Sequence, residues 1–149
     1  MLPKIIPLKL PRIIQAARRL TANGVTQLTK NNLFCLDVDD AYVHQLFPLL
    51  KDGTIQKPDY FGAQSIGAHI TIIYPEEQKK IQEKDLQKEH HFSVKEIVTA
   101  EIGPKIYYVL LVDSPSLLQL RHKYGLPDLL SFKGYSIGFH ITVGVIIQR

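Results

Sequence analysis

"GAHITIIY" at residues 67–74 and "GFHITVGV" at residues 138–145 are the two stretches that decide how this sequence folds. Each places a histidine and a threonine inside an otherwise apolar run, and such runs are typical of buried β-strands. Side chains two residues apart in a strand point to the same side, so His69 and Thr71 share one face and leave the other apolar. Burying an imidazole beside a hydroxyl without hydrogen-bond partners costs free energy. We therefore expect this polar face to line a cleft.

The second stretch repeats the arrangement, because His140 and Thr142 also share one face of their strand. Six histidines and seven threonines in 149 residues give about 0.3 His-x-Thr triplets by chance. Both triplets have the form Gly-x-His-Ile-Thr, and both lie in apolar strands. A single triplet would favour a core histidine with satisfied hydrogen bonds. The pair favours catalysis, because histidine is the commonest acid–base residue in enzymes.

The composition is that of an ordinary soluble globular domain, with 45% hydrophobic and 21% charged residues. Cys35 is the only cysteine, which excludes an internal disulfide and a cysteine metal cluster, and its apolar neighbours favour a place in the core. No apolar run is long enough to span a membrane, and the prolines and lysines of residues 1–14 do not suit a secretory signal. We therefore expect a cytoplasmic protein with no membrane partner.

The net charge of +4 is unevenly distributed along the chain. The segment before Asp37 contains six basic residues and no acidic residue. The rest of the chain carries 12 basic and 14 acidic residues. A basic N-terminal segment of this kind can attract RNA or another polyanion. The alternative is a solvated helix face, which is the commoner reason for a run of charges.

The hydrophobic pattern predicts one order of elements twice: strand, helix, loop and His-x-Thr strand, over residues 33–74 and again over 105–145. The charged segment between these halves is either an exposed helix or a tether. We therefore predict a bilobal α+β fold, with mainly antiparallel sheets, outer helices and both His-x-Thr strands facing a central cleft. The expected parts of this single domain, residues 1–149, are a basic N-terminal segment and helix (1–32), a first lobe (33–74), a charged connector (75–91) and a second lobe (92–149).

Turn and capping residues set the expected ends of these elements. Asn23-Gly24 are expected to end the first helix, and Gly103-Pro104 to form a hairpin turn. Ser114-Pro115 are expected to begin the last helix and Gly125 to end it. The expected strands are 33–38, 67–74, 92–103, 105–113 and 138–145; the expected helices are 11–20, 41–47 and 114–124; and the main loops are 52–66 and 126–138.

The two motifs resemble those of the two-histidine (2H) phosphoesterases. This family includes 2′,3′-cyclic nucleotide phosphodiesterases, "2′-5′ RNA ligase" proteins and exonucleases that trim RNA ends. The matching tetrads are "HITI" at residues 69–72 and "HITV" at residues 140–143. The resemblance extends over most of residues 33–149 but not over residues 1–32. It implies one motif per lobe, on central strands that face a shared cleft, and no metal or other cofactor.

The chemistry of phosphodiester cleavage accounts for these residue types. In-line cleavage needs a base that activates water or a hydroxyl, and an acid opposite it that protonates the leaving oxygen. Two histidines with pKa values near ~6.5 can supply one of each at neutral pH, and each proton transfer contributes about 10²–10⁴ in rate. Threonine hydroxyls can donate to the non-bridging phosphate oxygens. The predicted catalytic residues are therefore His69, Thr71, His140 and Thr142, and either histidine can be the base.

A metal site is the weaker interpretation of these residues. Two histidines and two hydroxyls make a poor zinc site, since zinc prefers a third strong ligand such as a carboxylate or thiolate. His90 and His91 are adjacent, so in a strand they face opposite ways and cannot chelate one ion together. We expect them, with His44 and His122, to be surface or structural residues.

The loops before the two motifs hold the candidates for substrate binding. Members of the family often stack a base on an aromatic residue there, which makes Tyr135 the first candidate and Phe61 or Tyr60 the next. Lys133 could contact a phosphate. The alternative for each is an ordinary loop or core residue, because aromatic packing is usually structural. Tyr74 is expected on the apolar face of its strand, outside the cleft.

The predicted function is a metal-independent phosphodiesterase acting, as a monomer, on a 2′,3′-cyclic phosphate of an RNA end or a small nucleotide. A second interpretation is 2′-5′ linkage chemistry, either ligation or cleavage, which needs the same four residues. The third is a nucleotide- or RNA-binding module without turnover. The basic N-terminal segment motivates this last interpretation, and the intact histidine–threonine pairs argue against it.

Overall fold

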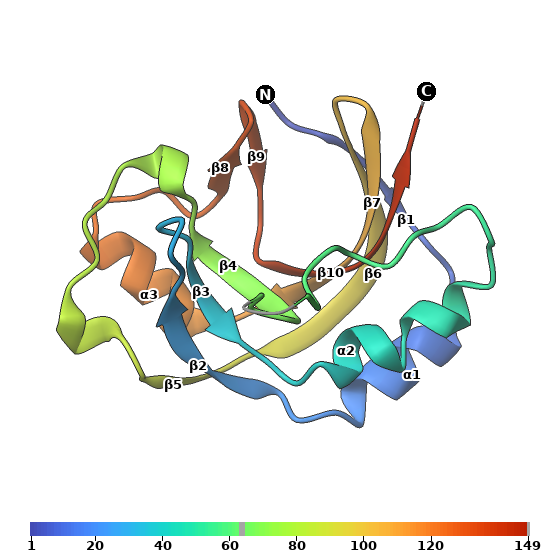
Figure 1. Cartoon of the computed structure of the whole chain (residues 1–149), viewed down its shortest axis with the longest axis horizontal. Helices are drawn as coiled ribbons and strands as arrows, with labels where there is room; N and C mark the ends of the chain where they lie inside the picture. Colours follow the sequence, from blue (N-terminus) through green and yellow to red (C-terminus); the bar gives the residue numbers. More distant parts are fainter. Residues whose placement is uncertain (63–64, 149) are drawn as a thin grey trace.

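The computed structural model describes residues 1–62 and 65–148 (Figure 1). Helices and short 3₁₀ turns separate runs of one to three strands along the chain. The strands are β1 Lys4–Pro7, β2 Asn23–Leu28, β3 Phe34–Asp37, β4 His69–Ile73, β5 Glu89–His91, β6 Ser93–Ile102, β7 Lys105–Asp113, β8 Leu130–Phe132, β9 Tyr135–Ile137 and β10 His140–Ile147; the helices are α1 Pro11–Arg18, α2 Ala41–His44 and α3 Pro115–Lys123; the 3₁₀ turns are η1 Phe47–Leu50, η2 Pro75–Glu77 and η3 Glu83–Asp85.

Within the described residues, eight strands form one sheet in the order β1-β6-β7-β10-β4-β3-β2-β5. Each pair of neighbouring strands is antiparallel, and β8 and β9 form a separate hairpin. The two His-x-Thr strands, β10 and β4, are neighbours at the middle of the sheet, where Ile141 pairs with Ile70. Figure 1 shows the sheet as a strongly curved surface with the helices on its outer side.

The core lies between the sheet and its helices. Ile70 and Ile72 of β4 are fully buried there, as is Ile141 of β10. They belong to one apolar cluster with Tyr42 of α2 and Leu117 of α3. Burying each such side chain contributes about 1.5–3 kcal/mol. Since side chains alternate along a strand, this packing turns the histidine and threonine of β4 to the opposite, concave side.

The observed fold confirms the predicted α+β class and the antiparallel sheet. The order of strand, helix and His-x-Thr strand is present as β3-α2-β4 and as β7-α3-β10, with the β8–β9 hairpin inserted into the second set. The strands of both halves join in a single sheet. The similarity of the two lobes remains a prediction.

The predicted end of the first helix is wrong. Helix α1 ends at Arg18, and Asn23 begins β2, which pairs with β3 and β5. Gly24 is needed here because β2 runs very close to its neighbour: a Cβ on Gly24 would lie 2.2 Å from the carbonyl oxygen of Asp37. A glycine that permits close strand contact therefore resembles a helix-stop signal in the sequence.

Two further segments contain elements that the sequence did not predict. Residues 75–91 form the turns η2 and η3 and the edge strand β5, so of the two interpretations of this segment the exposed helix is wrong. The expected loop at 126–138 contains the β8–β9 hairpin, whose turn has positive φ angles at Lys133 and Gly134. In the part of the chain that the structure describes, no helix has the length and apolar character needed to cross a membrane.

Candidate active site

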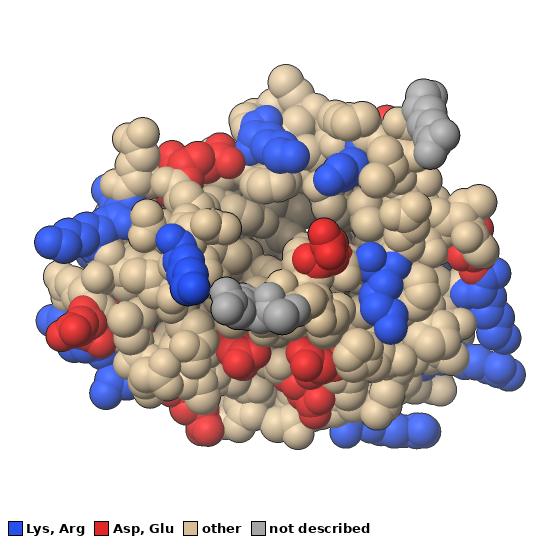
Figure 2. Space-filling view, in the orientation of Figure 1, with Lys and Arg blue, Asp and Glu red and all other residues tan. Residues whose placement is uncertain are grey.

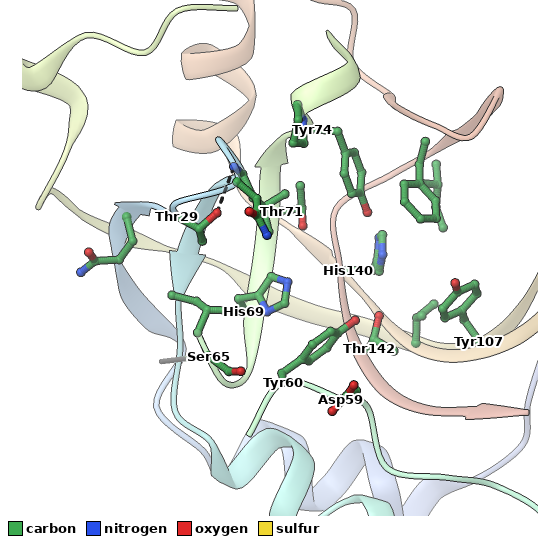
Figure 3. Close-up of a pocket in the computed structure, with 18 of the residues that line it drawn as sticks. Thr29, Asp59, Tyr60, Ser65, His69, Thr71, Tyr74, Tyr107, His140 and Thr142 are labelled. Atoms are coloured by element: carbon green, nitrogen blue, oxygen red, sulfur yellow. Dashed lines mark hydrogen bonds between the residues drawn. The ribbon is translucent and has the colours of Figure 1, made fainter. Parts of the chain in front are cut away.

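Both His-x-Thr motifs line one cleft with a volume of about 870 Å³. Figure 2 shows it as a hollow in the middle of one face of the molecule. His69 and Thr71 reach it from β4, and His140 and Thr142 reach it from β10 (Figure 3). The structure therefore brings the four predicted catalytic residues into one cleft.

The pairing of the two strands sets the spacing of these residues. Because Ile141 lies across from Ile70, the antiparallel register places His140 across from Thr71 and Thr142 across from His69. The two histidines are then diagonal neighbours on one face, a relation that separates backbones by about 7–8 Å. Each imidazole thus has a hydroxyl opposite it and a second imidazole within reach of the same small group.

The two imidazoles are oriented by the same hydrogen bond. His69 Nδ1 lies 2.8 Å from the carbonyl oxygen of Gly67, and His140 Nδ1 lies 2.8 Å from that of Gly138. A carbonyl oxygen can only accept, so in both rings Nδ1 carries the hydrogen and donates. The neutral rings consequently keep the lone pair on Nε2, the nitrogen that takes or gives a proton.

The backbone requires the glycine two residues before the histidine in only one of the two motifs. Gly67 has φ +77°, and a Cβ there would lie 2.4 Å from Oδ1 of Asp40. That oxygen accepts a hydrogen bond of 3.0 Å from the N–H of Ala68, which fixes the start of β4. At Gly138 a Cβ would meet only Leu129, at 3.9 Å. The backbone therefore requires glycine in the first motif but not in the second.

Burial lowers the pKa of His69 below its ordinary value of 6.5, and the hydrogen bond to Gly67 opposes this change. The pKa of His140 is also lowered, mainly by burial; the hydrogen bond to Gly138 opposes the shift and the neighbouring His69 adds to it. Both imidazoles therefore favour the neutral form when the cleft holds no anion.

Two tyrosines complete the surroundings of the motifs. The ring of Tyr60 lies edge-on to that of His69, with 4.7 Å between centroids. Burial raises the pKa of Tyr60, and the nearby Thr142 hydroxyl opposes the rise. Burial likewise raises the pKa of Tyr74, and the nearby Thr71 hydroxyl opposes it. Each motif threonine therefore shares the cleft with a tyrosine hydroxyl.

The prediction that Tyr74 lies outside the cleft is wrong, because its side chain lines the cleft. It assumed that the strand alternation continues to residue 74, whereas β4 ends at Ile73 and Tyr74 leads into η2. The ring of Tyr74 stacks on Phe132, with 4.7 Å between centroids. A tyrosine immediately before Pro75, where a strand gives way to a turn, is the signal that could have indicated this.

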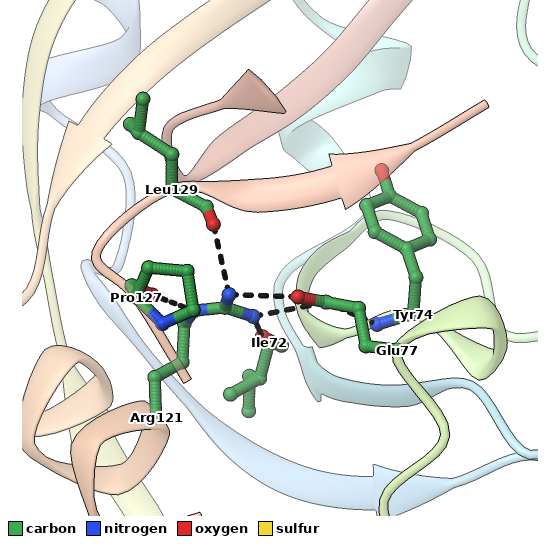
Figure 4. A network of polar contacts seen from close by, with 6 residues as sticks. All are labelled: Ile72, Tyr74, Glu77, Arg121, Pro127 and Leu129. Carbon is green, nitrogen blue, oxygen red and sulfur yellow. Dashed lines mark hydrogen bonds and ion pairs between the residues drawn. The ribbon is translucent and has the colours of Figure 1, made fainter. Parts of the chain in front are cut away.

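A buried ion pair holds this end of β4 in place (Figure 4). The side chains of Arg121 and Glu77 are 0% and 3% exposed and meet at 2.7 Å. Arg121 also donates 2.8 Å to the carbonyl oxygen of Ile72, while Glu77 accepts a 2.9 Å bond from the N–H of Tyr74. Helix α3 is thereby tied to the backbone on both sides of Ile73, which fixes the exit of Tyr74 toward the cleft.

The four predicted substrate-binding residues lie in different places. Tyr60 lines the cleft, whereas the other three are not among its described lining residues. Phe61 packs on His44 with 4.5 Å between ring centroids, because the chain turns away from the cleft after Tyr60. Lys133 lies at the tip of the β8–β9 hairpin, where its N–H donates to Glu76, and Tyr135 belongs to β9. The geometry therefore favours Tyr60 among the four.

The rest of the cleft includes residues that sequence reasoning missed. Tyr107 and Val109 of β7 form one wall, and Phe132 of β8 forms another part of the lining. Among the described lining residues the charged side chains are Lys30 and Asp59. The local sequence does not indicate that these residues line the cleft, because each reaches it from a strand or loop that carries no motif.

A comparison with protein families decides the identity of the domain. The model of the 2H phosphoesterase domain described as "Swiss Army Knife" (2H-SAK) matches residues 34–149. The chain belongs to the 2H phosphoesterases. The match begins with β3 and includes both His-x-Thr strands, which confirms the family that the motifs predicted. A phosphoesterase-type activity follows from this membership. Searches of curated proteins and of solved structures found no match.

Proposed function

We propose that this 2H phosphoesterase hydrolyses 2′,3′-cyclic phosphates of RNA ends or small nucleotides by acid–base catalysis with His69 and His140. The observation that carries the proposal is the shared geometry of the two imidazoles. They lie on neighbouring strands of one cleft, and both have Nδ1 bound to a carbonyl oxygen, which leaves both Nε2 atoms for proton transfer.

The proposed reaction adds one water across one phosphorus–oxygen bond. One neutral imidazole accepts a proton from water through Nε2 while the water oxygen forms its bond to phosphorus. On the opposite side the bond from phosphorus to the 2′ or 3′ oxygen breaks, and the second histidine, protonated at Nε2, gives that oxygen its proton. A phosphate monoester with a free hydroxyl results, and the two histidines exchange protons with solvent before the next turnover.

The charge of the substrate prepares the acid. Both pKa values are lowered in the free protein, mainly by burial. A bound phosphodiester is an anion, and a negative charge beside an imidazole favours the protonated form. Binding therefore raises the pKa of the histidine nearest the leaving oxygen. The hydroxyls of Thr71 and Thr142, one across from each imidazole, donate to the non-bridging oxygens and stabilise the charge that develops there.

The distribution of cations argues against a pure RNA-binding module. That interpretation rests on the six basic residues before Asp37. Of these, Lys30 alone is among the described residues that line the cleft. Arg12 and Arg18 belong to α1, which packs on β6 through its buried Ile13 and Ala17. The basic segment is therefore mostly part of another surface.

A substrate panel with excess EDTA tests the proposal. It should contain nucleoside 2′,3′-cyclic phosphates, 2′-5′ and 3′-5′ dinucleotides and an oligonucleotide ending in a cyclic phosphate, with the His69→Ala/His140→Ala double variant as background. We expect hydrolysis of the cyclic phosphates by the unmodified chain only. Faster cleavage of the 2′-5′ dinucleotide would reassign the linkage. RNA binding without product from any member of the panel would overturn the proposal in favour of a binding module.

A further inference from the structure

The cleft has little charge with which to hold an anion. Among its described lining residues the one ammonium of Lys30 is matched by the one carboxylate of Asp59. The histidines add positive charge only when they are protonated, and burial opposes their protonation. Stabilisation of a phosphodiester must therefore depend largely on neutral hydrogen-bond donors placed beside the imidazoles.

The side chains best placed for this are the hydroxyls of four residues that line the cleft: Thr71, Thr142, Tyr60 and Tyr74. The ring of Tyr60 lies against His69, with 4.7 Å between centroids. Figure 3 shows the two tyrosines entering the cleft from opposite sides, with their hydroxyls directed toward the motif residues.

Both tyrosines are suited to act as neutral donors. Burial raises the pKa of each phenol above its ordinary value of 10, so both keep their hydrogen at neutral pH. A hydroxyl carries one hydrogen and can accept two bonds. Each tyrosine therefore offers one hydrogen to an anion, and two tyrosines match the two non-bridging oxygens of a phosphodiester.

We propose that Tyr60 and Tyr74 are further catalytic residues, each of which donates a hydrogen bond to one non-bridging oxygen of the reacting phosphodiester. This inference rests on the proposed function of the site. Tyr74 follows the end of β4, Tyr60 lies in the loop before that strand, and the two side chains enter the cleft from opposite sides (Figure 3). The two hydroxyls therefore reach the phosphate from different sides and bind different oxygens.

The substitutions Tyr60→Phe and Tyr74→Phe test the proposal, since each removes a hydroxyl and keeps the ring. Loss of one oxyanion-hole donor costs about 10²–10³ in kcat, and because the motif threonines remain we expect a loss of roughly 10- to 100-fold with little change in KM. Tyr108→Phe is the matched control: Tyr108 neighbours Tyr107 on β7 but is not among the described residues that line the cleft. Its kcat should be unchanged.

The two diastereomers of a nucleoside 2′,3′-cyclic phosphorothioate identify which oxygen each tyrosine holds. Sulfur is a poor acceptor, so each diastereomer weakens the hydrogen bond from one tyrosine only. Each diastereomer should be hydrolysed more slowly than the ordinary cyclic phosphate by the unmodified chain. We expect Tyr60→Phe to remove this slowing for one diastereomer and Tyr74→Phe to remove it for the other. The ratio of the two rates is measured within one variant, so a partly unfolded preparation does not alter it.

The outcomes separate this inference from the proposed function. If the unmodified chain hydrolyses no member of the substrate panel, the proposed function fails. If it hydrolyses cyclic phosphates but both tyrosine variants keep full kcat, or both remove the slowing by the same diastereomer, the two tyrosines do not bind different oxygens of the phosphate and the inference is wrong.

Discussion

The buried ion pair between α3 and the end of β4 gives the sharpest prediction about stability. Arg121 uses all of its donors: its side chain bonds to Glu77 twice and to the carbonyl oxygens of Ile72, Pro127 and Leu129. The substitution Arg121→Met keeps an apolar stem of similar length but removes every one of these bonds. The carboxylate of Glu77, whose side chain is 3% exposed, then remains buried without its cation.

The expected cost of Arg121→Met follows from that uncompensated charge. Removing one partner of a buried ion pair destabilises a protein by about 3–5 kcal/mol. Whole domains are stable by about 5–15 kcal/mol, so this is a large part of the total. For a chain of this size each kcal/mol shifts the melting temperature by about 2–4 °C, which gives a fall of roughly 6–20 °C.

Thermal and urea unfolding, followed by circular dichroism, measure this change. Lys95→Met is the matched control, because it removes one positive charge from an exposed pair with Asp113 and should cost only about 0–1 kcal/mol. The double variant Arg121→Met/Glu77→Leu removes both charges. Its loss of unfolding free energy should be smaller than the sum of the losses in the two single variants. A cost below about 1 kcal/mol for Arg121→Met, or strict additivity in the double variant, would refute this reasoning.

Three further outcomes follow from the site and its strands. Gly67→Ala should lower the free energy of unfolding by roughly 1–3 kcal/mol, because of its positive φ and the contact with Asp40, while Gly138→Ala should cost less than about 1 kcal/mol; equal costs in urea unfolding would contradict this. The lowered pKa values of both histidines place the optimum of kcat/KM below pH 6.5, with activity lost as rising pH deprotonates the acid, so an optimum at pH 8 would be inconsistent. Burial raises the pKa of Cys35 to about 12, and a thiol reagent should therefore label it only in denaturant; rapid labelling of the folded chain would disprove its burial.

The sequence was sufficient to predict the elements that carry the motifs. Ile70 and Ile72 alternate with His69 and Thr71, and that local period placed the polar pair on one face and the core on the other. The family and the α+β class were predicted from the same repeats, since alternation and short motifs are properties of neighbouring residues.

Features that depend on distant contacts were not predictable in this way. Strand β1 has little local signal and exists because it pairs with β6 across more than 90 residues. The burial of Arg121 depends on Glu77 and Ile72, which lie 44 and 49 residues away. Tyr74 was misplaced because the exact end of β4 is fixed by that same network rather than by the strand period.

Replacing each motif histidine by asparagine tests the central claim most directly. In His69→Asn and His140→Asn the side-chain amide can still donate to the glycine carbonyl oxygen in place of Nδ1, while Nε2 is lost. The control is His122→Asn, which alters an exposed histidine paired with Asp128. On a nucleoside 2′,3′-cyclic phosphate in EDTA, we predict that each motif variant loses about 10²–10⁴ in kcat and that the control keeps full activity. Full turnover by either motif variant would contradict acid–base catalysis by the two histidines.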